Sequence, residues 1–143
     1  KYNFPDLQTV FDKLLNRGCP AYVPRHLPPP NAAIAAIKNA GGLAVWAHPI
    51  YRERNERAWA RRLMRKLGPV GLDAVETYYS MFGASETQML TELAEIYGLN
   101  GSGGSDFHGD NSPGIEIGSG AGKMHIPESI LQSLKGRLSC QKK

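Results

Sequence analysis

The sequence is poor in cysteine and contains no long hydrophobic run. Its two cysteines, Cys19 and Cys140, form no CxxC pair, so neither a disulfide framework nor a zinc ribbon is expected. No apolar stretch approaches the roughly 18 residues that a membrane-spanning helix needs, and the first residues carry no hydrophobic region of a signal peptide. We therefore expect free thiols in a reducing compartment, a cytoplasmic location and no membrane partner.

Neither positive nor negative residues are in large excess. Lys and Arg number 17 against 13 Asp and Glu, for a net charge of +4. This mild positive charge suits anionic substrates but does not by itself indicate nucleic-acid binding. The 143 residues, 41% of them hydrophobic, are enough for one folded domain and argue against disorder.

Short apolar runs alternate with segments of helical spacing. Strands are predicted over residues 43–47, 72–79 and 99–103, and a further strand is possible over 115–118. Helices are predicted from Asn3 or Pro5 to Gly18 and over 31–40, 55–67, 85–97 and 127–135, with Ser85 and Gln88 as a capping box. The prolines of residues 20–30 predict an extended loop. This alternation indicates an α/β fold with parallel strands.

Three polar residues follow predicted strands, namely His48, Asp106 and His108. The carboxyl ends of parallel strands are where α/β proteins place their chemistry. Asp106 and His108 project to the same side of an extended backbone, and imidazole and carboxylate groups suit a divalent first-row metal. The alternative is structural: His48 as a turn histidine, and Asp106 as a helix N-cap or Asx-turn residue.

Several ordered motifs resemble one known family. Residues 41–49 (GGLAVWAHP) and 103–109 (GGSDFHG) resemble two motifs of the polymerase and histidinol phosphatase (PHP) superfamily. Residues 71–76 (GLDAVE), 22–25 and 115–118 are similar to further segments of that family. The resemblance runs from about Phe4 to Leu134 and is strongest to bacterial members related to nucleoside 3′,5′-bisphosphate phosphatase and a 5′–3′ exoribonuclease.

The resemblance implies a fold and an activity. The expected fold is part of a distorted (β/α)7 barrel with parallel strands. His48, Asp106 and His108 match family metal ligands. Glu76, near the end of its predicted strand, is a candidate ligand or a carboxylate that orients one, and the alternative is a structural glutamate on the sheet face. The implied cofactors are divalent ions, with manganese, zinc and iron left open. These would bind the phosphate of a phosphorylated small molecule or a short RNA and activate a water molecule for hydrolysis.

The sequence also departs from the family pattern. It lacks the opening HxHxxxSDG-type and TDHD-type motifs, contains four histidines in all, and has Trp46 where a smaller aliphatic residue is usual. Three or four strands cannot close a seven-stranded barrel. We therefore expect residues 1–143 to be the C-terminal portion of one PHP domain, weak or inactive alone and partnered by a missing N-terminal half. The alternative is a catalytically inactive structural or interaction module, whose open strand edges favour self-association.

Several other residues have two alternative interpretations, one functional and one structural. Arg25 is a candidate phosphate ligand because its guanidinium matches phosphate oxygens, although both Arg25 and the neighbouring His26 can also be solvated loop residues. Tyr78 and Tyr79 either stack on a nucleobase or pack in the core. The basic segment 52–66 is either a track for an RNA backbone or a solvated helix face.

Overall fold

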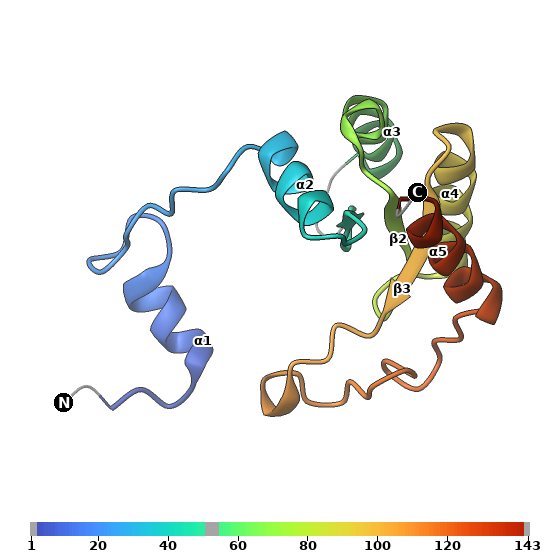
Figure 1. Ribbon diagram of the computed structural model, residues 1–143. Coiled ribbons are helices and arrows are strands. Elements are labelled where there is room, and N and C mark those ends of the chain that lie inside the picture. The colour runs from blue at the N-terminus through green and yellow to red at the C-terminus, as the bar shows by residue number, and fades with distance from the viewer. Residues whose placement is uncertain (1–2, 51–54, 142–143) are drawn as a thin grey trace.

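The computed structural model of the protein describes residues 3–50 and 55–141, and Figure 1 shows their arrangement. The elements, in chain order, are α1 (Leu7–Val10), the π-helical segment η1 (Phe11–Leu15), α2 (Pro30–Asn39), β1 (Val45–Trp46), α3 (Glu56–Leu67), the 3₁₀ turn η2 (Gly68–Val70), β2 (Ala74–Tyr79), α4 (Ala84–Ile96), β3 (Asn100–Gly104), the 3₁₀ turn η3 (Gly109–Asn111) and α5 (Glu128–Gln141).

The described residues form one three-stranded sheet in the order β1-β2-β3, and both strand pairs are parallel. Val45 lies opposite Ala74, which in turn lies opposite Asn100. The helices α3 and α4 provide the crossovers between successive strands. This confirms the predicted α/β class with parallel strands.

The core lies between this sheet and the helices that follow its strands. Helix α3 buries Ala60, Met64 and Leu67, whose spacing places them on one stripe, and α4 buries Leu90 and Leu93. Val75 of β2 belongs to the same apolar cluster. Full burial of each large apolar side chain contributes roughly 1.5–3 kcal/mol, so this cluster fixes β2 against both helices.

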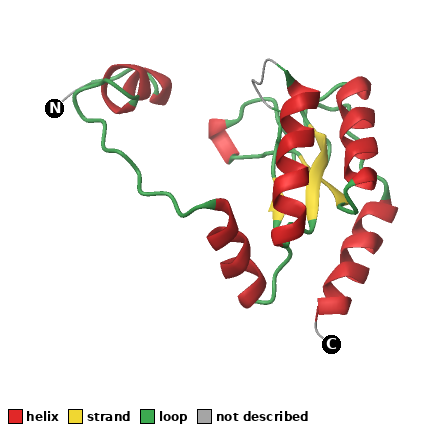
Figure 2. Cartoon of the chain, turned by 90° about the horizontal axis from the view of Figure 1, so that it is seen from above, coloured by secondary structure: helices red, strands yellow, loops and turns green. Residues whose placement is uncertain are grey.

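The amino-terminal segment stands apart from the sheet in both Figure 1 and Figure 2. Residues 22–29 form the extended connection that the prolines predicted. Asp6 begins α1 by accepting a 2.6 Å hydrogen bond from the Thr9 backbone N–H, one residue beyond the predicted Pro5 start. Several large apolar side chains here are exposed: Leu7, Phe11, Leu15, Val23 and Leu27.

Two local predictions were wrong. Residues 115–118 form no strand, only a single antiparallel bridge between Glu116 and Gly120, because left-handed backbone at Gly114, Gly118 and Gly120 turns the chain back on itself. The capping box is not Ser85 with Gln88. Instead, the Glu86 carboxylate accepts a 2.9 Å hydrogen bond from the Gly83 backbone N–H, so the cap lies two residues earlier than predicted.

Cys19 and Cys140 are free, as predicted. Among the helices of the described residues, none has both the length and the apolar character needed to cross a bilayer.

Candidate metal centre

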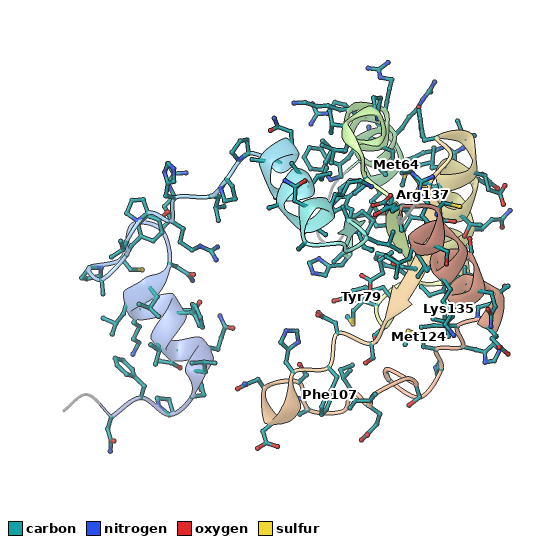
Figure 3. The ribbon with its side chains drawn as sticks, in the orientation of Figure 1. Met64, Tyr79, Phe107, Met124, Lys135 and Arg137 are labelled. Atoms are coloured by element: carbon teal, nitrogen blue, oxygen red, sulfur yellow. The ribbon has the colours of Figure 1, made fainter. Side chains whose placement is uncertain are left out.

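The candidate site is built at the carboxyl ends of the three strands. His48 lies in the turn after β1, Glu76 and Tyr79 lie on β2, and Asp106 lies in the loop after β3. Tyr79 is paired in register with Gly104, the last residue of β3, so the loop that carries Asp106 begins beside the end of β2. Figure 3 shows Tyr79 at this end of the sheet.

Glu76 links the first strand to the third. Its Oε2 accepts a 2.6 Å hydrogen bond from the His48 backbone N–H. On its other side it faces Gly104, where a Cβ would come within 3.1 Å of Oε1, so glycine allows the carboxylate this close approach. Burial raises the pKa of Glu76, partly offset by the His48 backbone N–H and the charge of His48, while the negative charge of Asp106 raises it further.

Asp106 is held from β2 by a tyrosine. The Tyr79 hydroxyl donates to Asp106 Oδ2 at 3.1 Å, and the Tyr79 and His48 rings lie 5.7 Å apart between centroids. His48 and Asp106 both have left-handed backbones, with φ of 29° and 57°. Non-glycine residues adopt this conformation at an energetic cost, and such residues cluster at functional sites.

His108 folds back on the same loop. Its Nδ1 lies 2.7 Å from the Asp106 backbone oxygen and 3.6 Å from Asp106 Oδ1. A carbonyl oxygen can only accept, so Nδ1 carries the proton in this hydrogen bond. In neutral His108 the lone pair is then on Nε2, the usual arrangement of a metal-binding histidine. The side chain is 64% exposed, so Nε2 is accessible to a ligand.

The donor types of His48, Asp106 and His108 fit a divalent first-row metal. Within residues 3–50 and 55–141, however, no three His, Cys, Asp or Glu side chains are grouped closely enough to hold one ion. The structure thus brings the predicted ligands to one edge of the sheet without assembling a complete coordination shell from the described residues.

Tyr79 is the residue of this site whose role was not predicted. The sequence suggested stacking or packing, and the structure shows a 7% exposed ring whose hydroxyl reaches Asp106. A tyrosine at the end of a buried strand is a usable signal, since a buried phenol needs a hydrogen-bond partner. Ser80 supports the same loop by donating to the Ser105 backbone oxygen at 2.7 Å.

Arg25 and His26 lie elsewhere. Both are exposed in the extended segment before α2, on the part of the chain that Figures 1 and 2 show apart from the sheet. Arg25 borders a hollow with Phe11 and Tyr22. Its role in phosphate binding stays a prediction.

Comparison with known proteins finds similar bacterial enzymes. No family model matches it. It is 31% identical over 133 residues to a 3′,5′-nucleoside bisphosphate phosphatase of Chromobacterium violaceum, covering 93% of this chain and 46% of that protein. It is 36% identical over 121 residues to a 5′–3′ exoribonuclease of Escherichia coli K12, covering 85% of this chain and 40% of the enzyme.

Two solved structures are also similar to this chain. An amidohydrolase of Chromobacterium violaceum, crystallised with sulfate and no metal, aligns with a TM-score of 0.68 at 29% identity, over 96% of this chain and 46% of its own. A candidate metal-dependent phosphoesterase of Bifidobacterium adolescentis aligns with a TM-score of 0.70 at 25% identity, over 91% and 44%. The chain thus spans about half the length of the proteins it matches.

The resemblance predicted from the motifs is confirmed: the chain is a homologue of about half of a nucleoside bisphosphate phosphatase and of a 5′–3′ exoribonuclease from bacteria.

Proposed function

We propose that this chain is part of a phosphoesterase that uses divalent metal ions to hydrolyse nucleotides or short RNA. The observation that carries the proposal is the meeting of His48, Glu76 and Asp106 at one edge of the sheet, through the His48–Glu76 hydrogen bond and the Tyr79–Asp106 hydrogen bond. The relatives named as phosphatase and exoribonuclease support it.

In this proposal His48, Asp106 and His108 hold a divalent metal ion. Their imidazole and carboxylate groups suit manganese, zinc and iron alike. Bound metal supplies a water of lowered pKa and neutralises phosphate charge. Glu76 is a positioning residue: its hydrogen bond fixes the backbone of His48. Tyr79 orients the Asp106 carboxylate.

We further propose that the remaining ligands come from outside residues 1–143 and that this chain is the C-terminal portion of a single domain. The support is its coverage of 46% and 40% of the two relatives, together with the incomplete grouping of ligands among the described residues. Its partners would be the rest of that domain and a phosphorylated small molecule or short RNA. We also propose that the protein is located in the cytoplasm.

The test is metal-dependent hydrolysis. A nucleoside 3′,5′-bisphosphate and a short 5′-labelled RNA are incubated with the chain and Mn²⁺, with and without chelator, while Mn²⁺ binding is followed by calorimetry. We expect Mn²⁺ binding that Asp106→Asn abolishes and that the exposed control Asp12→Asn retains. Equal Mn²⁺ binding and equal hydrolysis by Asp106→Asn and the parent chain would refute the assignment of this site.

One observation favours a second candidate, an inactive structural or interaction module. Strand β1 lies at the edge of the sheet, and Val45 on it is 41% exposed. An open strand edge invites association with another chain. A folded chain that binds no Mn²⁺, but dimerises with rising concentration in sedimentation experiments, would support this function over the enzymatic one.

A further inference from the structure

One face of α3 carries a dense group of positive charges. Arginines at four-residue spacing, Arg57, Arg61 and Arg65, form a row along this helix, and Arg62 lies beside it. All four are exposed, and together with Ala58 and Asn55 they line a shallow hollow of about 410 Å³. Figure 3 shows long nitrogen-tipped side chains leaving α3 into the solvent.

Among residues 3–50 and 55–141, one ion pair involves this face. It joins Arg57 to Glu92 of α4 at 3.5 Å, and both side chains of this pair are about half exposed. Like charges four residues apart on a helix repel each other. The row therefore retains a repulsion that a bound polyanion would relieve.

Trp59 links Arg62, which lies beside this row, to the turn that carries His48. The Trp59 indole N–H donates to the Pro49 backbone oxygen at 3.0 Å, and Pro49 directly follows His48. The same indole ring lies beneath the guanidinium of Arg62, 4.9 Å from its centroid, and so holds that side chain in place. The first turn of helix α3 thus lies beside the turn that carries His48.

We propose that this arginine face of α3 binds the phosphate backbone of a single-stranded RNA whose end lies at the candidate metal centre. Guanidinium groups bind phosphate oxygens through paired hydrogen bonds. Four-residue steps separate Arg57, Arg61 and Arg65 by roughly 6 Å along the helix, which a flexible strand of phosphates can follow. The short side chain of Ala58 also lines this hollow.

This inference deepens the proposed function and rests on it for the position of the RNA end. It selects a polymer, rather than a mononucleotide alone, as the ligand. Phosphate binding by the arginine row requires no metal ion. RNA binding is therefore measured with chelator present, and the result does not depend on hydrolysis.

The experiment compares two doubly substituted chains of equal net charge. Arg61→Gln with Arg65→Gln removes two positions of the row. The control, Lys13→Gln with Lys135→Gln, removes two exposed lysines from η1 and α5. Fluorescence anisotropy gives the Kd of a 12-nucleotide labelled single-stranded RNA between 50 and 300 mM salt, and circular dichroism confirms that each chain is folded.

Each phosphate contact contributes about −0.7 to the slope of log affinity against log salt for a single strand. Loss of two contacts is expected to reduce the slope by about 1.4 and to weaken binding about 25-fold at 0.1 M salt. The lysine control is expected to retain both the slope and the Kd of the parent chain.

Equal loss in both substituted chains would show that only net charge matters and would overturn the proposal. The same conclusion would follow if the arginine variant lost binding to vesicles rich in phosphatidylserine but kept its affinity for RNA. Failure of the metal-binding test with this RNA result intact would overturn the proposed function alone.

Discussion

Replacing Asp73 by asparagine is expected to destabilise the fold more than any other single loss of charge. The Asp73 side chain is fully buried, just before β2. Its carboxylate accepts hydrogen bonds from Lys38 Nζ at 2.9 and 3.0 Å, the Ala44 backbone N–H at 3.0 Å, Arg137 Nε at 3.1 Å and Gln141 Nε2 at 2.8 Å. It therefore joins α2, the start of β1 and α5 to the central strand.

The expected loss of unfolding free energy depends on how exposed the charged partners of Asp73 are. Breaking a buried ion pair costs about 3–5 kcal/mol when the remaining charge stays buried. The Lys38 and Arg137 side chains are 31% and 42% exposed, so both can regain water once the carboxylate is gone. We therefore expect Asp73→Asn to lower the free energy of unfolding by about 2–4 kcal/mol at neutral pH.

The loss should depend on pH. Burial raises the pKa of Asp73, but hydrogen bonds from Lys38, Ala44, Arg137 and Gln141 outweigh it and leave the pKa below the ordinary 3.8. A carboxyl with a lowered native pKa stabilises the fold fully above its unfolded pKa, and this stabilisation disappears as the pH falls through the native pKa. The difference between the two chains should therefore shrink below about pH 3.8.

Urea unfolding followed by tryptophan fluorescence measures this difference at pH 7 and pH 3. The matched control is Asp110→Asn in the exposed turn η3, which should stay within about 0.5 kcal/mol of the parent chain. A loss for Asp73→Asn no larger than that of the control, or one of the same size at both pH values, would refute the reasoning.

Two further substitutions test the packing of β3 and the support of the site. At Gly103 a Cβ would lie 2.8 Å from the Tyr78 Cβ and 3.0 Å from its backbone oxygen, so Gly103→Ala should cost about 1–3 kcal/mol. By contrast Gly136→Ala, in open space within α5, should stabilise the chain by about 0.5–1 kcal/mol, and urea unfolding compares the two. Glu76→Gln weakens the acceptor of the His48 N–H and should lower Mn²⁺ affinity about tenfold or more; unchanged affinity by calorimetry would remove Glu76 from the site.

The strands and the position of the site were predictable because both follow local rules. Continuous apolar runs such as 72–79 mark buried parallel strands, and residues after such strands, His48 and Asp106 among them, lie at one edge of the sheet. Both patterns are formed by residues that are close together in the sequence, so they can be recognised without knowledge of tertiary contacts.

The contacts that hold the site were not predictable, because they join distant segments. Tyr79 and Asp106 are 27 residues apart, and no periodicity relates them. The same limit explains α5, predicted to end at Lys135 but continuing to Gln141. Its last turns are anchored by Gln141 and Arg137 on the buried Asp73, which outweighs the low helix propensity of Gly136.

The central claim is that His48, Asp106 and His108 bind a divalent metal, and metal content per chain tests it most directly. Elemental analysis of protein purified without chelator is compared with Asp106→Asn and with the control Asp12→Asn. We predict about one divalent ion per chain after incubation with Mn²⁺, lost in Asp106→Asn and kept in Asp12→Asn. A folded chain that takes up no metal, or an Asp106→Asn chain that keeps it, would contradict the account.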